Sequence, residues 1–100
     1  MRCLREKFTW LAAQKGHLDV LKLLIKAGGD VNQLREGGGS PLIVASGEGH
    51  VECVKVLLAA GAYALHKSDD GFTALDFAIR YKHPAVMAIL RAHLEVKAEA

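Results

Sequence analysis

Histidine is the residue type in this sequence that most invites a chemical role. His17, His50 and His83 recur every 33 residues, and His66 and His93 have no partner at ligand spacing. Imidazole is a common metal ligand, but helices that stack side by side lie about 8–10 Å apart. The ligands of one zinc ion must each lie roughly 2 Å from it. We therefore predict no metal site, and expect each in-register histidine to hydrogen-bond locally at the start of a helix.

The remaining reactive residue types also favour structural roles. Cys53 occupies the position that Val20 and Val86 hold one period away, which favours a small buried side chain over a nucleophile. The glycines at 37–39 lack the Gly-Lys-Ser/Thr ending of a phosphate-binding loop, and we interpret them as a loosened turn tip. No arrangement of serine, histidine and acid suggests a catalytic site. The sequence predicts no enzyme and no cofactor.

Composition narrows the class of protein and its partners. Of 100 residues, 51% are hydrophobic and 24% are charged, which is typical of a globular domain. Thirteen basic against eleven acidic residues leave a net charge of +2, too small to favour nucleic acid or a membrane as a partner. The N-terminus does not resemble a signal peptide, and two cysteines cannot form a disulfide framework. We expect an intracellular protein, cytoplasmic or nuclear.

A period of 33 residues organises the chain. The in-register sets include Ala12/Ala45/Ala78, Val20/Cys53/Val86, Leu23/Val56/Ile89 and Leu24/Leu57/Leu90. Repeats of this length indicate a stack of supersecondary units, each burying its apolar face on its neighbours. Small residues at the alanine positions predict close approach of the helices there.

Each period reads as two short helices joined by turns. In the middle one, Ser40 is a candidate helix cap followed by Pro41, and Gly47 and Gly49 are expected to end the helix. A second helix is predicted over residues 51–60, with one apolar stripe, and Gly61 closes it. Residues 62–72 carry turn chemistry.

This pattern resembles the ankyrin repeat. Ser40-Pro41-Leu42 and Thr73-Ala74-Leu75 are close to its Thr-Pro-Leu-His opening, and residues 49–62 are very near its second helix and exit turn. In the family's phase the repeats run 2–34, 35–67 and 68–100, forming one domain. The resemblance implies an all-α helix–turn–helix repeat solenoid with turn or hairpin tips.

The two end repeats depart from the family pattern. Lys7-Phe8-Thr9-Trp10 replaces the opening motif in the first, so Cys3, Leu4, Phe8 and Trp10 suggest an incompletely capped end. In the third, Arg91 takes the place of Leu58, and Leu94 that of Gly61, so the last helix is expected to continue through Glu95, Lys97 and Glu99. Those polar residues suit the outer face of a terminal repeat.

The resemblance also implies where a partner protein would bind: on the turn tips and the concave face of the first helices. Phe72, Arg80 and Tyr81 are the main candidates, because aromatic residues and arginine dominate binding hot spots. Packing of Phe72 under its turn and of Tyr81 over the last repeat is the alternative. Gly47 and residues 37–39 leave the middle of the face nearly bare. Further candidates at the tips and helix ends are Gln14, Lys15, Glu36, Glu48, Lys67, Asp69 and Asp70, with Trp10 at the other end.

Two functions therefore remain open at this point. The first is a protein–protein interaction module, an adaptor or regulatory binding domain. The alternative is a structural or self-associating fragment of a longer ankyrin array, which would associate through its N-terminal repeat.

Overall fold

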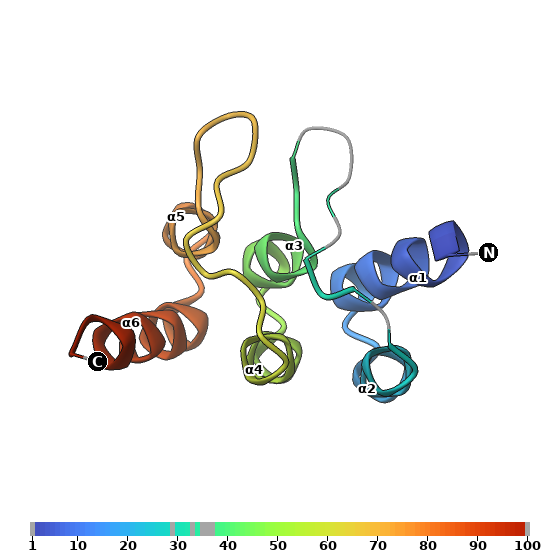
Figure 1. Ribbon diagram of the computed structural model, residues 1–100. Helices are drawn as coiled ribbons and strands as arrows, with labels where there is room; N and C mark the ends of the chain where they lie inside the picture. Colours follow the sequence, from blue (N-terminus) through green and yellow to red (C-terminus); the bar gives the residue numbers. More distant parts are fainter. Residues whose placement is uncertain (1, 29, 33, 35–37, 100) are drawn as a thin grey trace.

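In the part of the chain that the structure describes, the backbone forms six α-helices arranged as three hairpins. The computed structural model describes the backbone of residues 2–28, 30–32, 34 and 38–99, and the side chains among these from 8 to 94. The first helices of the hairpins lie in one row, and the second helices lie in another row below them in the view of Figure 1. Their bounds are α1 Arg2–Lys15, α2 Leu18–Lys26, α3 Pro41–Glu48, α4 Val51–Ala59, α5 Ala74–Arg80 and α6 Pro84–Glu99. The described residues contain no strand, so the all-α prediction is confirmed.

The ends of α3 show how local sequence sets the helix bounds. Ser40 Oγ accepts a hydrogen bond from the backbone N–H of Ile43 at 3.2 Å, and Pro41 follows at the first helical position. At the other end Gly49 adopts a left-handed conformation with φ of 78°. Gly47, expected to help end the helix, lies inside it instead. One left-handed glycine is enough to stop the helix, and the prediction for Gly47 was wrong.

The core lies between the two rows and between successive hairpins. The most extensive inter-hairpin contacts join α1 to α3 and α3 to α5. Ala12, Ala45 and Ala78 are at most 3% exposed, so the small residues predicted to permit close approach are buried where these helices meet. Cys53 is 2% exposed, as expected for a small buried residue. Burial raises the pKa of its thiol, with a smaller contribution from the nearby Glu52 carboxylate.

The histidines that begin α4 and α6 connect hairpins rather than bonding locally. His50 Nε2 donates to the Gln14 carbonyl and His83 Nε2 to the Gly47 carbonyl, both at 2.9 Å and both 36 residues back along the chain. Neither His17 nor His50 caps its own helix with its side chain. The prediction of local bonding was therefore wrong, because each ring reaches across to the end of the preceding first helix.

Each of these rings packs against a glycine of the preceding hairpin. A Cβ atom added to Gly16 would lie 2.7 Å from the His50 ring, and one added to Gly49 would lie 2.6 Å from the His83 ring. Ordinary contact between carbon atoms needs about 3.5–4.0 Å. Both glycines also have positive φ angles, 72° and 78°. The corresponding position of the third repeat is Lys82, with φ of 59°, and no described hairpin follows it.

The last helix extends beyond the length of α2 and α4. α6 runs to Glu99, as expected from Leu94 standing where Gly61 closes the second helix of the second repeat. Arg91 is exposed, whereas Leu58, its counterpart in the second repeat, is 9% exposed. The side chains of Glu95, Lys97 and Glu99 lie outside the described residues.

Candidate partner-binding surface

The start of α5 is fixed by a reciprocal pair of hydrogen bonds. Thr73 Oγ1 accepts from the Asp76 N–H at 3.2 Å, and Asp76 Oδ2 accepts from the Thr73 N–H at 3.0 Å. This capping box satisfies two backbone donors that the first turn of a helix leaves without partners. Asp76, which replaces the histidine of the family motif, therefore has a structural role here. It sets the direction in which the chain enters α5.

Phe72, immediately before this cap, packs on the side of α5. Its ring meets that of Phe77 edge to face, with centroids 5.7 Å apart and an interplanar angle of 67°. Contact between the residue before the cap and the fourth helical residue is a hydrophobic staple, which holds the entry angle of the chain. Phe72 nevertheless remains 36% exposed. It is therefore both a packing residue and part of the surface.

Two further contacts connect the other main candidates, Tyr81 and Arg80, to the pair of phenylalanine rings. The Tyr81 ring stacks on Phe77, with centroids 6.2 Å apart and planes 5° from parallel. The Arg80 guanidinium carbon lies 5.7 Å from the centre of the Phe72 ring, within cation–π range. We call Phe72, Phe77, Arg80 and Tyr81 the aromatic cluster. Tyr81 is 53% exposed and Arg80 is also exposed, so the cluster offers an aromatic and a cationic group side by side.

Phe77 connects the cluster, and sequence reasoning missed it. Its position four residues before Tyr81, on the same side of a helix, was the available signal. Phe77 joins Tyr81 to Phe72, whereas Arg80 contacts the Phe72 ring directly. The proximity of these residues depends on the Phe72–Phe77 edge-to-face contact and the Phe77–Tyr81 stacking, as well as on their spacing along the helix.

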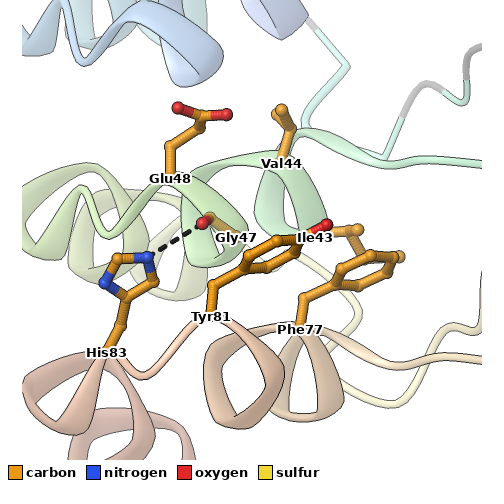
Figure 2. A pocket seen from close by; sticks show the side chains of 7 residues that line it. All are labelled: Ile43, Val44, Gly47, Glu48, Phe77, Tyr81 and His83. Atoms are coloured by element: carbon orange, nitrogen blue, oxygen red, sulfur yellow. Dashed lines mark hydrogen bonds between the residues drawn. The ribbon is translucent and has the colours of Figure 1, made fainter.

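A pocket of about 590 Å³ lies between α3 and α5, beside the cluster (Figure 2). Its lining residues are Ile43, Val44, Gly47, Glu48, Phe77, Tyr81 and His83. Gly47 leaves room for it: a Cβ atom there would lie 3.8 Å from Tyr81 Cδ2, an ordinary contact distance. The middle of this face is therefore a hollow with the Tyr81 ring alongside it.

The polar groups of the pocket are few. Glu48 is exposed at the pocket and makes no ion pair with any side chain that the structure describes. The Gly47 carbonyl already accepts the hydrogen bond from His83 (Figure 2). The carboxylate of Glu48 is thus available to a basic or hydrogen-bond-donating group of a ligand, while Ile43, Val44 and the rings supply apolar contact.

The candidates at the tip between α4 and α5 are exposed but lie outside the pocket lining. Lys67, Asp69 and Asp70 are all exposed. A Cβ atom added to Gly38 would meet Asp69 Oδ1 at 2.7 Å, and His66 Nε2 donates to the Gly38 carbonyl at 2.9 Å. The neighbouring tips therefore contact each other.

This contact corrects the interpretation of the glycines at 37–39 as a loosened tip. Gly38 is buried, with φ of 78°, and only a residue without a side chain fits against Asp69. Gly37 and the candidate Glu36 lie outside the described residues.

The candidates contributed by α1 are spread along its length. Lys15 is exposed at the end of the helix, in register with Glu48 and Tyr81. Gln14 is half-buried, and its backbone carbonyl bonds His50. Trp10 is half-buried, and its Nε1 lies 3.9 Å from where a Cβ atom of Gly39 would be.

Among the described residues, no group of three or more His, Cys, Asp or Glu side chains has a geometry that could hold a metal ion. No helix in the described part of the chain is long and apolar enough to cross a membrane.

Comparison with known proteins identifies a family. A family model described as ankyrin repeats, in three copies, matches residues 9–100. A search of curated proteins found no match to this chain.

Proposed function

Because this chain belongs to the ankyrin-repeat family, whose members are generally protein–protein interaction modules and typically not enzymes, we propose that it binds another protein through the pocket between α3 and α5. In this proposal the chain acts as an adaptor or regulatory binding domain without catalytic activity. The aromatic cluster forms the centre of the contact. Lys67, Asp69 and Asp70 flank it at the tip between α4 and α5, and Glu48, Lys15, Gln14 and Trp10 continue it along the first helices. Glu36, which lies outside the described residues, is a further candidate from the sequence.

The observation that carries the proposal is the aromatic cluster beside a hollow. Exposed Phe72, Arg80 and Tyr81 lie at or beside a pocket of about 590 Å³ whose lining combines apolar and aromatic side chains with Glu48 and His83. Hot spots of protein interfaces are enriched in tyrosine and arginine beside pockets that fill on binding. The contacts of Phe77 with Phe72 and Tyr81 already restrain both rings, so binding loses less side-chain entropy there.

The shape and charge of the pocket favour a particular kind of partner segment. An apolar side chain fits against Ile43, Val44 and Phe77, and a neighbouring lysine or arginine pairs with Glu48. We therefore expect a segment with an apolar residue followed or preceded closely by a basic one. Charge pairing at the rim contributes more to specificity and association rate than to affinity.

The test compares truncation, occlusion and a matched control. Tyr81→Ala removes the ring that stacks on Phe77, and Gly47→Leu places a side chain in the pocket that Gly47 lines. Tyr63→Ala is the control, because Tyr63 is 68% exposed but does not line the pocket. Each variant is first checked for unchanged helicity by circular dichroism.

Partners captured by the wild-type protein are identified by mass spectrometry, and their affinity for each variant is then measured by calorimetry. We expect a loss of at least tenfold, about 1.4 kcal/mol, for Tyr81→Ala and Gly47→Leu. Tyr63→Ala should bind like wild type. A partner that binds all four proteins equally would rule out this pocket as its site.

Association through the N-terminal repeat is the second candidate function. The exposed apolar side chains Phe8, Val20 and Leu23 favour it, at 51%, 47% and 66% exposure. The chain would then act as a structural part of an assembly or as a fragment of a longer array. Self-association is tested by sedimentation velocity over a wide range of concentrations, where a constant monomer mass would exclude it.

A further inference from the structure

The first repeat exposes side chains at positions that the second and third repeats cover. The exposed residues are Phe8, His17, Val20 and Leu23, which we call the N-terminal face. In the later repeats the preceding hairpin covers the same positions, which are all buried or half-buried: Pro41, His50, Cys53, Val56, Ala74, His83, Val86 and Ile89. The contrast is sharpest at one position, where Val20 is 47% exposed and Val86 is 0% exposed.

The N-terminal face also carries one half of the junction seen twice inside the molecule. At each internal junction a histidine ring packs on a left-handed glycine of the preceding hairpin. The ring also donates a hydrogen bond to the backbone carbonyl of the residue two positions before that glycine. His17 is the equivalent ring of the first repeat. It is exposed, and no described residue accepts a hydrogen bond from its side chain.

We propose that the N-terminal face docks a further ankyrin-type repeat whose first helix ends at a left-handed glycine. That glycine would receive the His17 ring, and the carbonyl two residues before it would accept the hydrogen bond from Nε2. The apolar side of the docked hairpin covers Phe8, Val20 and Leu23. The internal junctions support this docking, because they show the same residue positions covered by a preceding hairpin.

A second copy of this chain does not meet this requirement when it stacks head to tail. Its last hairpin offers Lys82 where Gly16 and Gly49 stand at the internal junctions. A Cβ atom at those two glycines would lie 2.6–2.7 Å from the next histidine ring. The Cβ atom of Lys82 would therefore clash with His17 of the next copy. The N-terminal face therefore needs a hairpin with glycine at this position, which the last hairpin of this chain does not offer.

The proposal specifies the partner for the second candidate function and does not depend on the pocket between α3 and α5. The two are separable, because variants of His17 and Leu23 leave the aromatic cluster unchanged, and Tyr81→Ala leaves the N-terminal face unchanged. Failure of one test therefore says nothing against the other proposal.

A four-repeat protein supplies the docked hairpin directly. A copy of residues 35–67 is placed ahead of residue 2 of the full chain, so that the period of 33 residues is maintained across the junction. We expect one cooperative thermal transition whose midpoint lies at least 4 °C above that of the original chain. In the matched control, the added copy carries Gly49→Lys, which reproduces the side chain of Lys82, and most of the gain should be lost.

His17→Ala separates docking from a general effect of added length. In the original chain it should shift the midpoint by less than 2 °C, since His17 is exposed and does not cap α2. In the four-repeat protein it should remove a large part of the gain, and in the Gly49→Lys control it should raise the midpoint by relieving the clash. A four-repeat protein with no gain, or with a gain insensitive to both substitutions, would overturn the proposal.

Sedimentation of the original chain tests the competing occupant. We expect a monomer at all concentrations up to those of the thermal measurements. A dimer that Leu23→Glu dissociates would overturn the proposal by showing that a second copy covers this face.

Discussion

Gly49→Ala is a direct test of the junction between repeats. The new methyl group would lie 2.6 Å from His83 Nδ1 and 2.7 Å from Cε1, well inside contact distance. The ring cannot move away freely, because its Nε2 bonds the Gly47 carbonyl at 2.9 Å. The substitution therefore imposes two costs, a strained backbone and a displaced histidine.

The magnitude of each cost can be estimated. Placing alanine at φ of 78° costs roughly 1–2 kcal/mol. Displacing His83 loses a hydrogen bond with a net contribution of about 0.5–1.5 kcal/mol. The sum is about 1.5–3.5 kcal/mol, which corresponds to a fall of roughly 6–28 °C in the unfolding midpoint of a domain of this size.

Gly61→Ala is the matched control. Gly61 also has a positive φ, 94°, and a Cβ atom there meets nothing within 4 Å. It should cost the backbone strain alone, about 1–2 kcal/mol. Denaturant unfolding followed by circular dichroism measures both variants, and Gly49→Ala combined with His83→Ala should show strong coupling. If Gly49→Ala is no more destabilising than Gly61→Ala, the histidine contact does not stabilise the stack.

Three further predictions concern the core, a buried thiol and a helix cap. Ala45→Leu should destabilise the protein by about 1–3 kcal/mol in urea unfolding, because Ala45 is 0% exposed between packed helices; an unchanged midpoint would refute the close packing. Burial raises the pKa of Cys53, so the folded state favours the thiol. The contribution of the Cys53 thiol to the free energy of unfolding is complete below the thiol pKa of the unfolded state, about 8.5. It is lost as the pH rises through the raised pKa of the folded state. Cys53→Val should therefore flatten the fall in stability above that pH, and parallel pH profiles would contradict this. Thr73→Ala should cost about 0.5–2 kcal/mol in thermal unfolding by removing the cap of α5, and a cost no larger than that of an exposed serine or threonine elsewhere would argue against the capping box.

The predicted fold agreed well with the structure because its signals are local. Ser40 and Thr73 cap their helices through side-chain bonds to residues three positions on, which lie within the same short segment. The small residues at 12, 45 and 78 recur because every repeat packs its first helix in the same way. Gly47 was misassigned, since a glycine inside a helix and one that ends it look alike in sequence.

The candidate site was predicted less completely. Phe72, Arg80 and Tyr81 were recognisable from residue type and repeat phase, but Phe77 was not, because its role depends on contacts with both Phe72 and Tyr81. A bare middle of the concave face was expected from Gly47, but the pocket itself was not predicted. It forms between helices of different repeats, and its size depends on where the Tyr81 ring lies relative to Gly47.

The sequence by itself determined the period, which is visible as residue types recurring every 33 positions. It also determined the helices and their caps, because these follow from backbone bonding and side-chain spacing within each short segment. The tertiary structure alone decided the bonding of the histidines, whose acceptors lie 36 residues back along the chain. It also decided exposure. Val20, Cys53 and Val86 share one position in the repeat, yet only Val20 is open, at 47%. Burial depends on whether another hairpin packs in front of a residue, and no local pattern carries that information.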